Sequence, residues 1–123
     1  MSIDVLVVDD IATNLKLARV LLSGAGYRVA VAADADQALA AIAADPPRVV
    51  LMDIQLPGTD GLELTRRLKA DPATRGLVVI AVTAYAMKGD EERMLAAGCD
   101  GYVAKPLDPD GLIGAVARHL QAH

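Results

Sequence analysis

Residues 49–53, Val49-Val50-Leu51-Met52-Asp53, form an apolar run that ends in an acidic residue. The apolar part of this run, residues 49–52, is too short for a helix and is typical of a strand that is buried on both faces of a sheet. Four similar runs rich in Val, Ala and Ile lie at residues 3–8, 28–32, 78–82 and 101–104. We therefore expect five buried strands.

Segments with helical spacing separate these runs. The first of them carries one apolar stripe and ends at a pair of glycines: Ile11, Leu15, Ala18, Leu22, then Gly24 and Gly26. Alternating strands and helices predict an α/β fold with helices on both faces of a parallel sheet. The expected architecture is a doubly wound, flavodoxin-like (βα)5 fold with a five-stranded sheet in the order 2-1-3-4-5. In such sheets ligands bind at the carboxyl ends of the strands, between strands 1 and 3.

Length and charge narrow the classes of function. The 123 residues fit one domain, which we place at residues 1–123. A net charge of −4 and a pI near 5.0 argue against a nucleic-acid surface, and no apolar run approaches the roughly 18 residues that a membrane helix needs. The first residues lack a secretory signal, so we expect a cytoplasmic protein. The lone Cys99 is expected to be a small, partly buried side chain.

Polar residues follow four of the predicted strands: Asp9 and Asp10, Asp53, Thr83, and Lys105. Taken singly, each is explained by a turn or a helix cap. Together they reach one edge of the sheet, where carboxylates about 5 Å apart repel one another by about 3 kcal/mol per pair at an effective dielectric constant near 20. All-oxygen ligation without His or Cys favours Mg²⁺, and a lysine and a hydroxyl could orient a phosphoryl group.

Four motifs in this order resemble the receiver domains of bacterial response regulators, the CheY-like family: Val7-Val8-Asp9-Asp10, Leu51-Met52-Asp53-Ile54-Gln55-Leu56-Pro57-Gly58, Thr83-Ala84 and Lys105-Pro106. The resemblance extends over the whole chain. Residues 85–93 and 98–102 further resemble single-domain receivers of the DivK type and the receiver domains of hybrid kinases.

The resemblance implies a role for each residue of the acidic edge. Asp53 would be the phosphoacceptor, which attacks a phosphohistidine on a sensor histidine kinase or a histidine phosphotransfer protein. Asp10 and Asp53 would bind Mg²⁺ directly, with the backbone carbonyl of Gln55 as a third ligand. Asp9 would act through water, and Lys105 would balance the developing charge. The protein would then be a phosphoacceptor that takes part in its own phosphorylation and dephosphorylation, rather than an enzyme.

The same resemblance implies a switch. The Thr83 hydroxyl would move to the phosphoryl group and Tyr102 would turn inward, which would remodel the face of helix 4, strand 5 and helix 5 for a protein target. The Lys105-Pro106 bond resembles the cis peptide of the family. Gln55 and Tyr85 flank the expected entry of a hydrolytic water and are candidates for setting the phosphoryl lifetime; the alternative for Tyr85 is an exposed, partner-facing aromatic side chain.

Three alternatives remain at this point. A phosphatase of the haloacid-dehalogenase type needs a second Asp two residues after the nucleophile, where this chain has Gln55. A Rossmann or P-loop nucleotide binder needs a glycine-rich loop after the first strand, but residues 9–13 contain no glycine. A degenerate receiver that only binds a protein partner is expected to lack some site residues, and all five are present.

Overall fold

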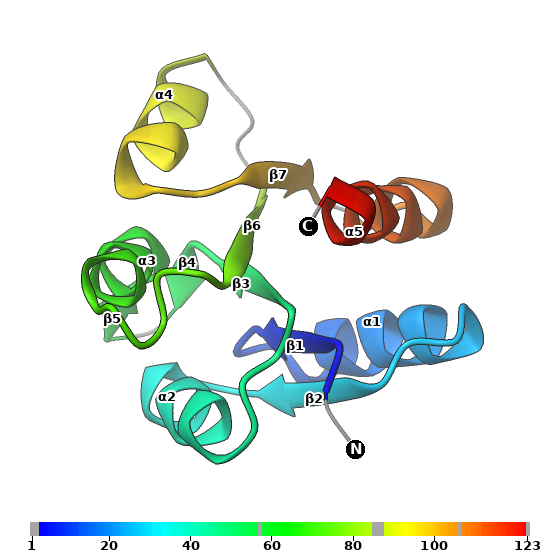
Figure 1. Cartoon of the computed structure of the whole chain (residues 1–123). Coiled ribbons are helices and arrows are strands. Elements are labelled where there is room, and N and C mark those ends of the chain that lie inside the picture. Colours follow the sequence, from blue (N-terminus) through cyan, green and yellow to red (C-terminus); the bar gives the residue numbers. More distant parts are fainter. Residues whose placement is uncertain (1–2, 57, 85–87, 106, 123) are drawn as a thin grey trace.

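A parallel five-stranded sheet forms the centre of the molecule (Figure 1). The computed structural model describes residues 3–56, 58–84, 88–105 and 107–122. The strands of the sheet, in spatial order, are β2 (Val29–Ala32), β1 (Val5–Val8), β3 (Val49–Asp53), β6 (Val78–Thr83) and β7 (Gly101–Ala104). This is the predicted order 2-1-3-4-5, with β6 and β7 as the fourth and fifth strands of the sheet.

Strand bounds differ slightly from the predicted runs. The first strand begins at Val5 rather than at residue 3, while β3 and β6 each extend by one residue, to Asp53 and Thr83. A further two-stranded antiparallel sheet, β4 (Gln55–Leu56) and β5 (Thr59–Asp60), follows β3 and was not predicted. Strands of two residues carry no periodic pattern, so the sequence alone does not reveal them.

Helices cover both faces of the large sheet. Figure 1 shows α1 and α5 on one face and α2, α3 and α4 on the other. Their bounds are α1 Ala12–Gly24, α2 Ala35–Ala44, α3 Gly61–Ala70, α4 Lys88–Ala97 and α5 Pro109–Ala122. Among the described helices, none combines the length and the apolar character needed to cross a lipid bilayer.

Each face of the sheet has its own apolar core. Along β1, Val5 and Val7 pack with residues of α1 and α5, whereas Leu6 and Val8 pack with residues of α2, α3 and α4. Because both faces are covered, every position of β1 is apolar, and the strand appears in the sequence as an unbroken apolar run.

Two predictions of burial need correction. Ala18 and Leu22 of α1 are fully buried, but Ile11 precedes the helix in an extended conformation and is 48% exposed. Its N–H group donates a hydrogen bond to Asp9 Oδ1 at 2.9 Å, which turns the chain into the helix and directs the Ile11 side chain outward. Cys99, predicted to be partly buried, lies in the core beside α3 and α4.

Candidate functional site at the carboxyl edge of the sheet

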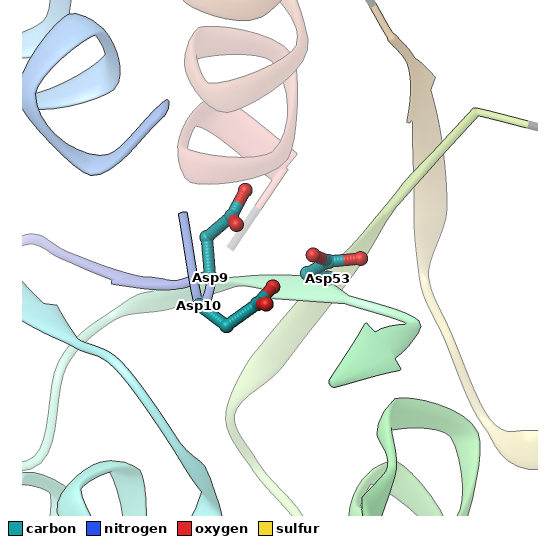
Figure 2. A group of neighbouring side chains, drawn as sticks. All are labelled: Asp9, Asp10 and Asp53. Carbon is teal, nitrogen blue, oxygen red and sulfur yellow. The ribbon is translucent and has the colours of Figure 1, made fainter. Parts of the chain in front are cut away.

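Three carboxylates meet where β1 and β3 end. Asp9 and Asp10 directly follow β1, and Asp53 is the last residue of the neighbouring strand β3. Their ligand oxygens all lie within 4.8 Å of one another, and Figure 2 shows the three side chains gathered around one space. Asp9 and Asp53 are buried, whereas Asp10 is exposed to solvent. The predicted convergence of these acids at one sheet edge is therefore present.

Backbone hydrogen bonds orient the two buried carboxylates in the same way. Asp9 Oδ1 accepts a hydrogen bond from the N–H of Ile11, and Asp53 Oδ1 accepts one from the N–H of Gln55, each at 2.9 Å. Both are turns in which an aspartate side chain binds the backbone two residues further along. The second oxygen of each carboxylate, Oδ2, faces Lys105.

Lys105 follows β7 and bridges the two buried acids. Its Nζ lies 3.1 Å from Asp53 Oδ2 and 3.4 Å from Asp9 Oδ2. Burial alone would lower the pKa of the Lys105 ammonium, but its hydrogen bond to Asp53 and the charges of Asp53 and Asp9 together raise the pKa above its ordinary value. Lys105 therefore stays protonated at neutral pH and offsets part of the negative charge of the cluster.

Thr83 and Tyr102 lie on the adjacent strands β6 and β7. Thr83 is the last residue of β6, one position beyond the residue that pairs with Asp53, and its side chain is completely buried. Its carbonyl accepts a hydrogen bond from the N–H of Lys105 at 2.7 Å. Tyr102 is 40% exposed in this structure. The expectations for Tyr85 and for the Lys105-Pro106 bond fall on residues 85 and 106, outside the described residues.

The donor set fits a hard divalent cation. Carboxylate oxygens are the preferred ligands of Mg²⁺, which usually binds one or two protein carboxylates and keeps several water ligands. The exposed Asp10 leaves the cluster open toward solvent, so water and phosphate oxygens have access to it. The side chain of Gln55 is exposed, whereas its backbone N–H donates a hydrogen bond to Asp53 within the acidic cluster.

Sequence reasoning missed two features of the site. The first is the contact of Lys105 with both Asp9 and Asp53, because a strand-end lysine gives no indication of which acids it faces. The second is Gly61, the first residue of α3, which lies directly against the backbone of Asp53 and Ile54. A glycine at the start of a helix, just after the capping Asp60, was the available signal for it.

Comparisons with known proteins agree with the geometry. Residues 5–117 match the family model of the response regulator receiver domain. The chain is 42% identical over 120 residues to the polar-differentiation response regulator DivK of Brucella ovis, covering 98% of each protein. Its structure superposes on the chemotaxis response regulator CheY4 of Vibrio cholerae with a TM-score of 0.90 at 25% identity, covering 97% and 99% of the two chains.

A second structural relative carries a metal ion. The receiver domain of a sensor histidine kinase from Pseudomonas aeruginosa, solved with a magnesium ion coordinated in its active site cleft, is 34% identical and gives a TM-score of 0.87. The match covers 98% of this chain and 99% of that domain.

Proposed function

This chain belongs to the family of response regulator receiver domains, and we propose that Asp53 is the residue in it that accepts the phosphoryl group. The observation that carries this assignment is the position of Asp53: it is buried, it lies among two further carboxylates, and its Oδ2 is 3.1 Å from the Lys105 ammonium. As a receiver, the protein acts in a two-component phosphorelay. The phosphatase and constitutive-binder alternatives are not favoured.

Phosphoryl transfer involves three groups of the protein: the carboxylate of Asp53, the N–H of Gln55 and the ammonium of Lys105. An oxygen of the Asp53 carboxylate attacks the phosphorus of a phosphohistidine on a sensor histidine kinase or histidine phosphotransfer protein. A P–O bond forms, the P–N bond breaks, and its electron pair returns to the imidazole nitrogen, which leaves an acyl phosphate on Asp53. The N–H of Gln55 restrains the carboxylate through Oδ1 during the attack, and Lys105 supplies positive charge beside Oδ2.

Mg²⁺ is the proposed cofactor. Asp10 and Asp53 would hold it directly, together with the backbone carbonyl of Gln55, while Asp9 would contribute through water. When bound, the ion offsets the negative charge of the phosphoryl oxygens. The cluster of three carboxylates with a single lysine carries excess negative charge, which supports binding of a divalent cation there.

Phosphorylation is proposed to change the face formed by α4, β7 and α5. The added phosphoryl group would attract the Lys105 ammonium away from Asp9 and would draw the Thr83 hydroxyl toward it, and Tyr102 would turn inward from its exposed position. Leu95 of α4 is 57% exposed, so this helix also offers apolar surface to a protein target.

The remaining functional expectations are part of the same proposal. Residues 1–123 would act as one receiver unit in the cytoplasm, without binding nucleic acid or membrane, as the net charge of −4 and the pI near 5.0 support. Its only chemistry would be its own phosphorylation and dephosphorylation.

The test is to locate the acyl phosphate. Wild type, Asp53→Asn and a control, Asp36→Asn, which changes an exposed acid of α2, are incubated with Mg²⁺ and phosphoramidate. Intact mass and release by hydroxylamine then report the acyl phosphate. Wild type and Asp36→Asn should each gain one phosphoryl group and Asp53→Asn none. A hydroxylamine-labile phosphoryl group on Asp53→Asn would show that another residue is the acceptor.

A further inference from the structure

The N-terminal turn of α3 lies against the backbone of the proposed phosphoacceptor. A Cβ atom placed on Gly61 would meet the carbonyl oxygen of Asp53 and would lie only 2.6 Å from the Cα of Ile54. The N–H of Gly61 also donates a hydrogen bond to the Ile54 carbonyl at 3.2 Å. The three heavy atoms nearest to this Cβ all belong to the backbone of Asp53 and Ile54, so rotation of a side chain cannot relieve the closest contacts.

Glycine is required at this position for space, not for conformation. Gly26, Gly58 and Gly98 are the described glycines with a positive φ, and Gly61 is not among them. Alanine could therefore adopt the backbone angles of residue 61, and the cost of the substitution is the close approach of the two backbones. This distinguishes the site from a turn that needs glycine for its dihedral angles.

A buried hydroxyl holds the same turn from the other side. Thr65 of α3 is completely buried, and its Oγ1 donates a hydrogen bond to the Gly61 carbonyl at 2.9 Å. The Thr65 side chain also lies beside the thiol of Cys99, two residues after the end of α4. Gly61 is thus fixed between the Asp53–Ile54 peptide and the interior of α3.

We propose that Gly61 and Thr65 are positioning residues for the phosphoacceptor. By seating the first turn of α3 on the Asp53–Ile54 peptide, they keep the Gln55 N–H within 2.9 Å of Asp53 Oδ1 and direct Oδ2 toward Lys105. This inference rests on the proposed role of Asp53 and deepens it, because it adds two residues that touch neither the phosphoryl group nor the metal.

The expected displacement is large enough to affect phosphoryl transfer. An ordinary carbon contact begins near 3.4 Å, so a methyl group on residue 61 must separate the two backbones by about 1 Å. A misplacement of about 1 Å in a reacting group can slow a reaction by about 100-fold. The separation of the two backbones would also lengthen the hydrogen bond between the Gln55 N–H and the Asp53 carboxylate.

The first test compares Gly61→Ala with Gly24→Ala, a control at the end of α1 where a Cβ meets nothing within 4 Å. Three quantities are measured on the folded protein: the amide chemical shifts of Ile54 and Gln55 without metal, the Mg²⁺ dissociation constant, and the rate of acyl phosphate formation from phosphoramidate. In Gly61→Ala we expect shifted amides, weaker Mg²⁺ binding and a rate at least about tenfold lower, with Gly24→Ala like wild type. Lower stability with the other three quantities unchanged would overturn the proposal.

If Gly61→Ala does not fold, a second pair of variants tests the same proposal. Thr65→Val removes the hydroxyl and keeps the shape of the side chain, whereas Thr65→Ser keeps the hydroxyl. Thr65→Val should shift the Ile54 and Gln55 amide resonances and slow acyl phosphate formation. Thr65→Ser should keep the amide shifts and the rate of wild type. Equal shifts and rates in the two variants would contradict a positioning role for the hydroxyl.

Acyl phosphate formation by wild type distinguishes a failure of the positioning role from a failure of the proposed function on which it rests. If wild type itself forms no acyl phosphate at Asp53, the proposed function fails. If wild type is phosphorylated at Asp53 and the variants match it, only the positioning role of Gly61 and Thr65 fails.

Discussion

The ammonium group of Lys105 lies 3.1 Å from the carboxylate of Asp53, although 52 positions separate the two residues in the sequence. The same ammonium lies 3.4 Å from Asp9. Before any phosphoryl group or cation arrives, Lys105 thus neutralises part of the charge that a bound cation would neutralise. Lys105 and Mg²⁺ should therefore compete electrostatically for the same carboxylates, while both favour a phosphoryl group.

Replacement of Lys105 should separate metal binding from switching. Lys105→Ala removes a competing positive charge but no oxygen ligand, so its Mg²⁺ affinity should equal or exceed that of wild type. Without the amine to hold the phosphoryl group, beryllofluoride, a phosphoryl analogue, should no longer shift the amides of α4, β7 and α5. Calorimetry measures the affinity, and NMR follows the amide shifts.

The matched control for this experiment is Lys16→Ala, which removes an exposed lysine of α1. It should bind Mg²⁺ and respond to beryllofluoride as wild type does. A Lys105→Ala protein whose α4, β7 and α5 amides shift as fully as those of wild type would show that Lys105 is only a counter-charge.

Asp53→Asn should not destabilise the metal-free protein. At an effective dielectric constant near 20, the change relieves two repulsions of about 3 kcal/mol each and loses one attraction of about 5 kcal/mol to Lys105, a balance of about 1 kcal/mol in favour of Asn. The amide oxygen can still accept the hydrogen bond from Gln55. The melting temperature without Mg²⁺ should equal or exceed that of wild type, and a clear decrease would mean that the ion pair with Lys105 outweighs the repulsion.

Mg²⁺ should stabilise wild type through the same carboxylates. A ligand that binds only the folded state adds about 2.7 kcal/mol when its concentration is 100 times its dissociation constant. Asp10→Asn removes the exposed carboxylate of the cluster and should abolish most of this gain, while Asp36→Asn should keep it. Urea unfolding with and without Mg²⁺ gives the difference, and an equal gain in all three proteins would place the ion elsewhere.

Alkaline pH should destabilise the protein partly through Cys99. Burial raises the pKa of the Cys99 thiol above its ordinary value of 9.0, and the hydrogen bond with Thr65 opposes this only in part. The unfolded chain therefore releases the thiol proton first. The contribution to stability is complete below pH 9.0 and is lost as the pH rises toward the pKa of the folded state, by at most about 1.4 kcal/mol per pH unit.

The Cys99→Ala variant isolates this contribution. It should be less stable than wild type at neutral pH because of the lost packing, but its free energy of unfolding should fall less steeply above pH 9.0. Contributions that the two proteins share cancel in the comparison. Parallel stability curves for the two proteins would contradict a raised thiol pKa.

The large sheet and the acidic edge were predictable from local patterns. Parallel strands covered by helices on both faces must be apolar at nearly every position, so β1, β3 and β6 appear as short apolar runs. The carboxyl ends of such strands share one edge of the sheet, so residues that end or follow them, Asp53 and Asp10 among them, could be grouped before their distances were known.

By itself, then, the sequence determined the five strands of the large sheet and the acids that meet at its edge, because apolar runs and strand direction are local properties of the chain. The order of these five strands followed from their alternation with helices. Only the tertiary structure decided which acids Lys105 faces, that Ile11 is exposed, that Cys99 is buried in the core, and that Gly61 touches the backbone of Asp53. These relationships depend on how closely segments from different elements approach one another. Such distances are set by the packing of the whole core and leave no periodic trace in any one segment.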